Sequence, residues 1–515
     1  MGMGGRSAAP QHVIECLHRS IDERPMHNAI VFGRQRLTFA ELGDAVQQCA
    51  EFLHSVIASP GLVGLRLGRT PEYVVAYLAV AALGGVVVPF DDDAPTEEVL
   101  SEARALGLVA ILTNRKFAHL HGGAVIQVEG SDSRGGPIPW AVRGLAPLRP
   151  PALAQPVNPD APLVLLRTSG STWRPKRVML THRSALASSR AHRLSVGHGP
   201  DEVSLVALSM SYGYCHTTQL VAQIDAGGTL ALLPGTFLPR TFGEAVWAAG
   251  ATTTTLVPSM MTMLARAPDR KLADLASLRT IVFGGAPIRA DILDNLRVRL
   301  PRAELIQTYG QTEAGPRITT LRADAAQMRP GSVGRAIPGM RIEIRSTENG
   351  ESLPPCQTGE VVVCGDGVMS GYFDDAAATA EVLRDGWLHT GDLGWLDDAG
   401  FLWLSGRMRN LIITAGLNVV AEEIEAHLRQ VPGVADAAVF GEPDELRGES
   451  IHAVIVRLGG AAPTERDVRT FLGPRMQPHK LPRRISFVSE LPKTSNGKVD
   501  RVGLARLRIG GNDDR

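Results

Sequence analysis

The chain of 515 residues is longer than one hydrophobic core usually serves, so we expect at least two domains, the larger with an extensive buried interior. Hydrophobic residues make up 44% of the chain and charged residues 21%, a composition of ordinary soluble globular proteins that excludes extensive disorder away from the ends. Lysine plus arginine and aspartate plus glutamate both number 53, so only a local basic patch would attract nucleic acid or an anionic membrane, and we expect small molecules or another protein as partners.

The cysteines and the apolar segments indicate in which cellular compartment the protein is expected. The five cysteines are scattered and form no C-x-x-C pair, so the sequence predicts no zinc or redox pair and fits a reducing cytoplasm. The first residues, "MGMGGRSAAP", lack the apolar core of a signal peptide. The longest apolar run, residues 74–90, is interrupted by Gly84 and Gly85 and is short for a membrane span. We predict instead a buried helix ended by glycine and then a buried strand, "VVVPF".

Strands and helices alternate along the first three hundred residues. The stretch "LTFAELGDAVQQCAEFLHSVI" predicts a strand end and then an amphipathic helix, because Leu42, Val46, Ala50 and Leu53 recur at helical spacing. Further β-rich runs separated by helical segments are "LVAIL", "LVLL", "SLVAL", "GTLALL", "TTTTLV", "RTIVFGG" and "AELIQTYG". This alternation predicts an α/β fold with doubly wound parallel sheets, and no solenoid-type repeat is present.

The residue composition and the pattern of predicted elements change twice in the second half of the chain. From about residue 330, "GSVGRAIPGMRIEI" and "TGEVVVCG" are richer in glycine and in short strands, which predicts a small β-rich subdomain. Beyond "SGRMRN", residues 405–410, helical and strand-like segments such as "VVAEEIEAHLRQVPGV" and "SIHAVIV" predict a compact α+β module of about a hundred residues. We place the boundary near residues 407–409.

One stretch, "RTSGSTWRPKRV", residues 167–178, has the residue types that hold phosphate. Lys176 supplies a positive charge beside a set of hydroxyls and backbone N–H groups, a nest of donors suited to an anion: Thr168, Ser169, Gly170, Ser171 and Thr172. An ordinary Ser/Thr/Gly loop is the alternative. The stretch is not a Walker loop, because Pro175 rather than glycine precedes Lys176; the pair Gly497-Lys498 also fails, since Val499 follows it.

Seven stretches carry a resemblance to a known family. They are "TSGSTWRPKRV" from Thr168, "FGGAPI" from Phe283, "QTYGQTEAG" from Gln307, "SGYFDD" from Ser370, "GWLHTGDLG" from Gly386, "GRMRNLIITAGLNVVAEEIE" from Gly406 and "LPKTSNGKVDR" from Leu491. Together and in this order, over nearly the full length, they make the chain resemble the adenylate-forming superfamily of acyl-CoA synthetases, luciferases and nonribosomal peptide synthetase adenylation domains. The resemblance is to its acyl-CoA ligases, with an atypical phosphate loop.

The resemblance implies an architecture and a reaction. Residues 1–406 would form a large N-terminal AMP-binding and acyl-binding domain, with two doubly wound α/β subdomains and a small distorted β-barrel. Residues 407–515 would form a small mobile α+β domain that rotates about a hinge near Arg409. A carboxylic acid would react with ATP to give acyl-AMP and pyrophosphate, and a thiol, CoA or a carrier protein, would then displace AMP. Different faces of the small domain would serve the two halves.

The same resemblance assigns the nucleotide site of the large domain. Tyr309, next to Gly310, would stack on adenine, with a core aromatic as the alternative. Thr312 would donate to phosphate and Glu313 would bind Mg²⁺, which prefers hard oxygen ligands; helix capping is the alternative for both. Room beside the nucleotide would come from three small residues: Gly284, Gly285 and Ala286.

Further residues would serve the ribose and the small domain. Asp392 would accept the ribose hydroxyls, with a turn aspartate as the alternative. Arg407 would also reach the ribose. Lys498 would approach the carboxylate and α-phosphate during adenylation, with a solvated surface lysine as the alternative. Gly416 would let the pantetheine arm pass close to the backbone.

Two residues of the phosphate loop depart from the family pattern. The family has glycine at the positions of Trp173 and Arg177, and glycine lets backbone N–H groups approach the β- and γ-phosphates. The Trp173 ring would fill that space or displace the loop, whereas Arg177 would be able to donate to phosphate. Our hypothesis is that adenylation is weakened or lost while acyl-AMP and CoA still give the thioester, another enzyme then supplying the adenylate. The retained Lys176, Glu313 and Lys498 favour the ordinary two-step reaction with Mg²⁺.

The acid itself is less constrained. The segment "ALSMSYGYCHTTQ" lies where the family builds its acyl pocket, and its candidate lining residues are Tyr212, Gly213, Tyr214 and His216. Core packing for Tyr214 and a satisfied histidine for His216 are open alternatives. No aspartate stands there to pair with an ammonium group, which disfavours an α-amino acid and favours a neutral carboxylic acid. A carrier-protein-loading ligase, a luciferase-type oxygenase and a noncatalytic acyl or nucleotide sensor are the other classes.

Overall fold

The structure is a computed structural model that divides into two compact units. It describes residues 9–57, 61–115, 123–128, 158–168, 176–269, 272–414, 417–444, 448–459, 462–492, 499–500 and 504. The first unit comprises Met1–Thr168, Lys176–Arg341 and Val363–Leu388, and the second comprises Ser169–Pro175, Ile342–Val362 and His389–Arg515. The mixed α/β content, with a large N-terminal domain and a smaller C-terminal one, confirms the predicted fold class.

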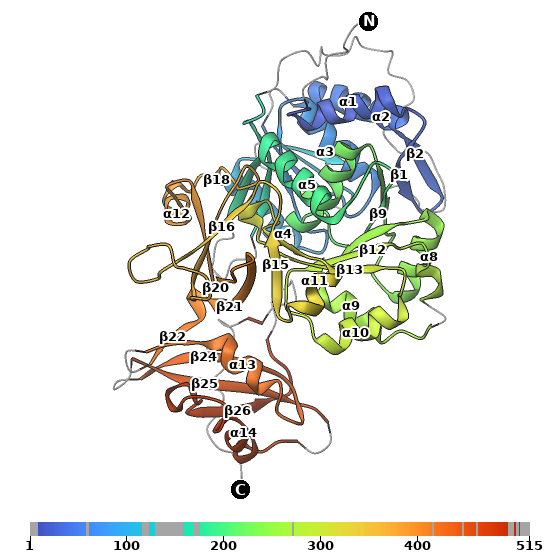
Figure 1. Cartoon of the computed structure of the whole chain (residues 1–515). Helices are drawn as coiled ribbons and strands as arrows, with labels where there is room; N and C mark the ends of the chain where they lie inside the picture. Colours follow the sequence, from blue (N-terminus) through green and yellow to red (C-terminus); the bar gives the residue numbers. More distant parts are fainter. Residues whose placement is uncertain are drawn as a thin grey trace, which may run out of the picture. The chain divides into compact units, whose positions relative to one another are not determined.

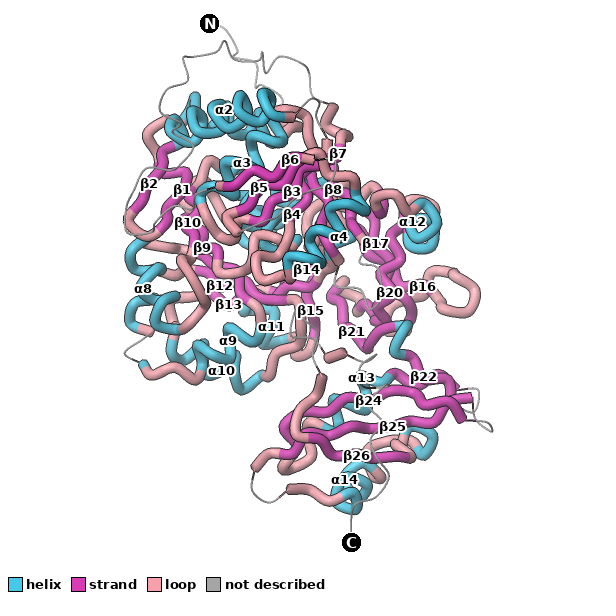
Figure 2. Tube along the Cα trace, turned by 180° about the vertical axis from the view of Figure 1, so that it is seen from behind, coloured by secondary structure: helices cyan, strands magenta, loops and turns pink. Residues whose placement is uncertain are grey.

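A seven-stranded sheet of the first unit carries the ends of the phosphate loop. Its order is β18 (Gly371–Tyr372), β8 (Arg177–Thr181), β7 (Pro162–Arg167), β4 (Val86–Pro89), β3 (Leu62–Arg66), β5 (Ala110–Thr113) and β6 (Ala124–Gln127). Strands β7, β4, β3, β5 and β6 run parallel, whereas β8 and β18 are added antiparallel. Helix α3 (Pro71–Ala82) contacts β3 and β4, and α4 (Thr96–Leu106) packs on the same strands through a separate apolar core (Figure 2).

A second sheet of the first unit ends in the predicted nucleotide motifs. Its strands follow the order β15 (Ser332–Ala336), β14 (Thr319–Leu321), β13 (Glu304–Tyr309), β12 (Thr280–Gly284), β11 (Thr253–Leu256), β9 (Val203–Val206), β10 (Thr229–Leu232), β1 (Asn28–Phe32) and β2 (Gln35–Thr38). From β13 to β1 all neighbours are parallel. Helices α8 (Pro239–Ala249), α9 (Pro258–Ala265) and α10 (Ala290–Arg299) cover one face of this sheet (Figure 1). The predicted parallel, doubly wound arrangement is confirmed.

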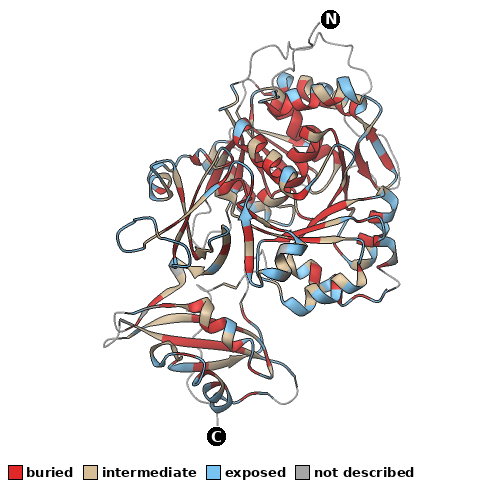
Figure 3. Ribbon diagram, in the orientation of Figure 1, coloured by how far each residue is buried: buried red, intermediate tan, exposed pale blue. Residues whose placement is uncertain are grey.

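The remaining helical segments of the first unit include those that build the acyl segment. They are α1 (Val13–Glu23), α2 (Phe39–Val56), α5 (His182–Val196), α6 (Gly213–Cys215), the π-helix η1 (His216–Val221), α7 (Ala222–Ala226), the 3₁₀ turns η3 (Ala273–Leu275) and η4 (Thr312–Ala314), α11 (Ala323–Met328) and α12 (Ala376–Val382). The prediction of a buried helix ended by glycine is confirmed: every residue of α3 except Ala82 is buried, and Gly84 follows at φ +72°. Figure 3 shows the buried residues in red, concentrated in the helices and strands of the interior.

The second unit contains a β-rich part and an α+β part. Strands β16 (Arg341–Arg345), β17 (Gly359–Cys364), β20 (Trp387–Leu396) and β21 (Phe401–Arg407) are neighbours in that order. Strand β19 (Leu383–Arg384) belongs to the first unit and pairs with the first residues of β20, Trp387 and Leu388, which belong to the same unit. A five-stranded sheet follows, in the order β23 (Leu417–Val420), β22 (Leu411–Thr414), β25 (Gly448–Arg457) and β24 (Val434–Asp444), and its fifth strand, β26 (Arg484–Val488), pairs with β25. Helices α13 (Ala421–Leu428) and α14 (Glu465–Leu472) share its apolar core, and the short turns are η5 (Met408–Asn410) and η6 (Pro478–Lys480).

Within the described ranges, no helix is long and apolar enough to cross a membrane. The apolar run at residues 74–90 forms most of the buried helix α3 and the strand β4. All five cysteines are free thiols; Cys16, Cys49 and Cys215 are buried.

Candidate active site

The antiparallel pair β7–β8 holds the two ends of the predicted phosphate loop. Arg167 lies opposite Arg177 in the ladder, and the N–H of Thr168 donates to the carbonyl of Lys176 at 3.1 Å. Residues 169–175 lie outside the described residues, including Ser169, Gly170, Ser171, Thr172 and Trp173. The sheet thus fixes where the loop begins and ends.

Arg177 corrects one expectation from the sequence. Its side chain is 3% exposed, and its Nε donates to Oε1 of Glu102 at 2.7 Å. Its Nη1 donates to the carbonyls of Pro89 and Leu165 at 3.0 and 3.1 Å, and the guanidinium lies 5.0 Å from the centre of the Phe90 ring. The Arg177 side chain therefore lies between the sheet and α4. Its expected role as a phosphate donor does not fit this position.

Lys176, the neighbour of Arg177, belongs to a different environment. Its half-buried ammonium lies 4.8 Å from the centre of the Tyr372 ring. The hydroxyl of Tyr372 donates to Oε1 of Glu313 at 2.9 Å, and the N–H of Met369 donates to the carbonyl of Glu313 at 2.9 Å. Burial and the Glu313 carboxylate raise the pKa of Tyr372, so its phenol stays protonated. The structure thus brings Lys176 and Glu313 to one tyrosine.

Glu313 fits the single carboxylate ligand that Mg²⁺ commonly takes alongside substrate phosphates. It is half-buried in η4, and Tyr372 occupies one of its two oxygens. Across the described ranges, no three or more His, Cys, Asp or Glu side chains gather as a metal site would require. Any magnesium bound here would therefore depend on Glu313 together with phosphate oxygens.

The end of β13 places the other predicted nucleotide residues. Tyr309 is the half-buried last residue of β13, which leaves the core-aromatic alternative open. A Cβ at Gly310 would lie 2.1 Å from the Pro316 carbonyl, so this close approach requires glycine. Gln311, not Thr312, is the N-cap residue of η4, and its side chain makes no cap bond. Helix capping therefore does not explain Thr312.

The end of β12 meets the acyl segment. A Cβ at Gly284 would lie 2.4 Å from the Thr308 carbonyl and 3.1 Å from the hydroxyl of Tyr214, which itself contacts Thr308 Oγ1 at 2.9 Å. Gly285, at φ +88°, and Ala286 are exposed. A Cβ at Gly213 would be 3.2 Å from Thr312 Cγ2. The structure thus brings residues of two other predicted groups next to the acyl segment: Gly284, at the end of β12, lies beside Tyr214, and Thr312 lies beside Gly213.

Two other residues of the acyl segment have polar partners. Tyr212 donates to Oδ2 of Asp91 at 3.4 Å, and burial together with this carboxylate raises the pKa of Tyr212 to about 12. His216 has no exposed surface; its Nε2 is 2.7 Å from the Tyr77 hydroxyl, and its Nδ1 is 3.3 Å from Thr217 Oγ1. Burial lowers the pKa of His216 to about 3. His216 therefore matches the satisfied-histidine alternative.

Sequence reasoning missed Arg317 behind the YGQTE motif. It is fully buried, and its guanidinium lies 5.0 Å from the centre of the Tyr214 ring. Among the described residues its nitrogens make no hydrogen bond of ordinary geometry. Burial lowers its pKa, and Tyr214 offsets part of that effect. Only its charge amid apolar neighbours could have marked it in the sequence.

The second unit brings together the two predicted ribose residues. Asp392 in β20 lies opposite Arg407 in β21, and Nε of Arg407 is 2.7 Å from Oδ1 of Asp392. The Asp392 side chain is almost fully buried, whereas that of Arg407 is 37% exposed. Asp392 lies inside a strand, so the turn-aspartate alternative was wrong.

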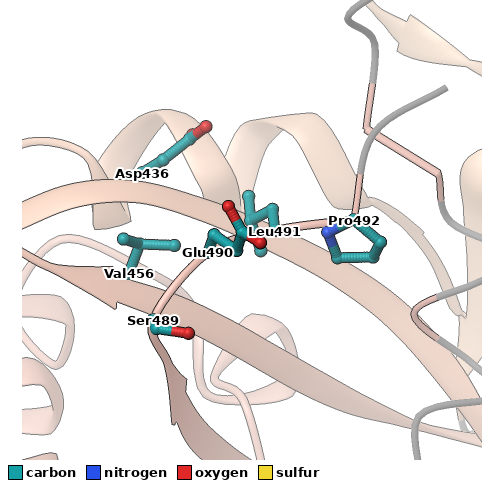
Figure 4. Close-up of a pocket in the computed structure, with 6 residues that line it drawn as sticks. All are labelled: Asp436, Val456, Ser489, Glu490, Leu491 and Pro492. Atoms are coloured by element: carbon teal, nitrogen blue, oxygen red, sulfur yellow. The ribbon is translucent and has the colours of Figure 1, made fainter. Parts of the chain in front are cut away.

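Three other residues of the small domain were predicted to belong to the site: Arg409, Gly416 and Lys498. Arg409 lies in the turn η5, whereas Gly416 and Lys498 lie outside the described residues. A pocket of about 340 Å³ in the second unit contains no predicted site residue (Figure 4). Its lining is Asp436, Val456, Ser489, Glu490, Leu491 and Pro492. The carboxylate of Asp436, one of these residues, is 3.0 Å from Nε of Arg429.

Comparison with known families agrees with the site. Residues 17–373 match the family described as AMP-binding enzyme, and residues 423–498 match the AMP-binding enzyme C-terminal domain. The chain therefore belongs to the AMP-binding enzyme family, which confirms the predicted resemblance to adenylate-forming acyl-CoA synthetases.

Curated relatives match over nearly their whole length. The chain is 32% identical to 4-coumarate–CoA ligase 3 of Oryza sativa subsp. japonica, covering 92% of this chain and 88% of the relative. It is 33% identical to a feruloyl-CoA synthase of an Amycolatopsis species, with coverage of 94% and 96%. It is 31% identical to the indoleacetate–CoA ligase of Aromatoleum aromaticum, with coverage of 96% and 97%. These relatives are CoA ligases.

Solved structures share the fold. ATP-bound MatB from Rhodopseudomonas palustris has a TM-score of 0.83 at 27% identity, over 96% of this chain and 98% of the other. o-Succinylbenzoate CoA synthetase (MenE) from Bacillus subtilis, in complex with the acyl-adenylate intermediate OSB-AMP, has a TM-score of 0.81 at 26% identity, over 96% and 99%. The similarity thus extends to proteins solved with ATP and with an acyl-adenylate.

Proposed function

We propose that this chain converts a carboxylic acid to its CoA thioester through acyl-AMP, with an adenylation half that is weakened rather than lost. The arrangement of Lys176, Tyr372 and Glu313 carries the proposal, because it keeps the predicted phosphate and magnesium groups within reach of one tyrosine. Arg177 is withdrawn into the sheet, so Trp173 is the remaining obstacle to a triphosphate. In an ordinary ligase of this type Mg²⁺ would neutralise charge on the phosphates.

In the adenylation step, each predicted site residue would bind one part of the nucleotide, the metal or the acid. Lys176 and Thr312 would bind phosphate, and Glu313 would hold the metal. Tyr309, Gly310 and the residues 284–286 would border the adenosine. Asp392 and Arg407, already paired, would hold the ribose. Lys498 would orient the carboxylate against the α-phosphate.

The second step would use another part of the chain. Gly416 would border the thiol path, and the boundary between residues 1–406 and 407–515, with its hinge near Arg409, would allow the small domain to turn between the two halves. This boundary and hinge are part of the proposal. CoA is the proposed acceptor because the curated relatives are named as CoA ligases. A cytoplasmic location remains a prediction from cysteine usage.

A neutral aromatic acid is the proposed substrate. The relatives named for coumarate, ferulate and indoleacetate support it. The half-buried Tyr212 and Tyr214 offer flat surfaces for such an acid, next to Gly213. His216 and Arg317 have no exposed surface, so neither is assigned a contact with the substrate.

A second candidate is an enzyme that performs the thioester half alone. Trp173 in the phosphate loop favours it, since a bulky ring would occupy triphosphate space. A separate adenylating enzyme would then supply acyl-AMP. A ligase that loads an acyl carrier protein would share every motif, and only a test of acceptors separates it.

The test separates the two halves. One vessel contains Mg-ATP, the acid and CoA, a second contains synthetic acyl-AMP and CoA, and thioester is followed by mass spectrometry across coumarate, ferulate and indoleacetate. We expect product in both, formed at least about tenfold faster from acyl-AMP, a barrier difference near 1.4 kcal/mol. Product only from acyl-AMP would support the half-reaction enzyme. No thioester in either vessel would exclude both.

A further inference from the structure

A short segment, residues 369–373, joins the phosphate loop to the YGQTE motif. Strand β18 pairs with β8, with Tyr372 opposite Val178, and the N–H of Phe373 donates to the Arg177 carbonyl at 2.8 Å. At its other end, the N–H of Met369 donates to the Glu313 carbonyl at 2.9 Å. The backbone of this segment is thus hydrogen-bonded both to β8 and to the YGQTE motif, which are more than a hundred residues apart in the sequence.

The position of Tyr372 within this segment is further constrained. Gly371 before it has φ +146°, and a Cβ there would lie 2.9 Å from Thr379 Cγ2, so the turn requires glycine. The N–H of Tyr372 donates to Thr379 Oγ1 at 2.9 Å. Because the backbone is held on both sides, the phenol is directed at Glu313 by a rigid support.

Tyr372 interacts with both adenylation groups by contacts weaker than an ion pair. Its hydroxyl donates to Oε1 of Glu313 at 2.9 Å, and its ring lies 4.8 Å from the Lys176 ammonium. Lys176 and Glu313 make no direct ion pair with each other in the part of the chain that the structure describes. A direct pair would neutralise both groups, whereas the phenol leaves the second carboxylate oxygen for a metal and the ammonium N–H groups for phosphate.

We propose that Tyr372 is a positioning residue for adenylation, which keeps Glu313 and Lys176 apart and aims the carboxylate at the metal. This inference rests on the proposed function of the site. It assigns a role to a residue for which the motif "SGYFDD" had suggested none. The thioester half needs neither group, so Tyr372 acts on one half of the reaction only.

The test measures metal binding as well as turnover. Mn²⁺ is titrated by electron paramagnetic resonance with a non-hydrolysable ATP analogue, using the full-length protein, Tyr372→Phe and Tyr372→Leu. Tyr372→Phe keeps the ring and loses the hydrogen bond, so we expect Mn²⁺ affinity to fall about two- to tenfold. Tyr372→Leu also loses the ring face, so it should in addition weaken binding of the nucleotide analogue.

A matched control removes a hydroxyl elsewhere. Tyr73 is buried in α3 and donates to the Met210 carbonyl at 3.2 Å, so Tyr73→Phe should leave Mn²⁺ affinity unchanged. All variants should convert acyl-AMP and CoA to thioester within about twofold of the unaltered chain, which also verifies folding. Equal Mn²⁺ affinity in Tyr372→Phe and the unaltered chain, or no Mn²⁺ binding by either, would overturn the inference. Absence of thioester from acyl-AMP in the unaltered chain would instead overturn the proposed function.

Discussion

Polar groups are buried to different degrees in two regions of the first unit. We call the region around Lys176, Glu313 and Tyr372 the phosphate side, and the region around residues 212–216 and Arg317 the acyl side. On the phosphate side, Lys176 and Glu313 are half-buried and meet at Tyr372. On the acyl side, His216 is fully buried with its ring against the Tyr77 hydroxyl, and Arg317 is fully buried with its guanidinium over the Tyr214 ring. The first arrangement suits a charged nucleotide that arrives from solvent. In the second arrangement the protein encloses both groups completely, so we expect neither of them to contact a substrate.

The largest expected effect concerns the ion pair between Glu102 and the buried Arg177, the first residue of β8. Glu102→Ala leaves the buried Arg177 without its carboxylate and should lower the free energy of unfolding by about 3–5 kcal/mol. Urea unfolding followed by circular dichroism measures it. As a control, Glu98→Ala breaks an exposed pair with Arg167, both side chains at least 40% exposed, and should cost at most about 1 kcal/mol. Equal effects of the two changes would refute the assignment of Arg177 to the core.

Removal of the carboxylate at Glu313 should affect the phosphate side only. Glu313→Gln should lower ATP-dependent acyl-AMP formation on the order of 100-fold, since one group that stabilises phosphate charge is worth about that much. Exchange of labelled pyrophosphate into ATP measures this half. Thioester formation from acyl-AMP should be unchanged, and a parallel loss there would show that Glu313 serves the fold rather than the metal.

The acyl side should respond to acid through His216. Its folded pKa of about 3 lies below the ordinary value of 6.5, so the unfolded chain takes up the proton first as the pH falls. The contribution of neutral His216 to the free energy of unfolding is therefore fully present above pH 6.5. As the pH falls below 6.5 this contribution decreases by up to about 1.4 kcal/mol per pH unit. His216→Gln should flatten the decline in urea midpoint between pH 6.5 and 5, whereas the exposed His54→Gln should not. Identical slopes would contradict this assignment.

The sequence predicted elements and motif residues better than side-chain directions. The β-rich runs became strands, and the parallel order followed from their alternation with helices. Arg177 could not be oriented, because residue type at a strand end does not tell which face it takes. The partner of Tyr372 is 59 residues away, and that of Tyr212 is 121 residues away. Such contacts depend on the tertiary fold and carry no local signal.

We propose that Trp173, and not Arg177, limits adenylation. The most direct measurement compares ATP–pyrophosphate exchange in the unaltered chain, Trp173→Gly and Arg177→Gly. We expect Trp173→Gly to raise exchange by about tenfold, near 1.4 kcal/mol of barrier, and Arg177→Gly to leave exchange no faster while lowering the free energy of unfolding. No change in Trp173→Gly, or a gain in Arg177→Gly, would contradict it.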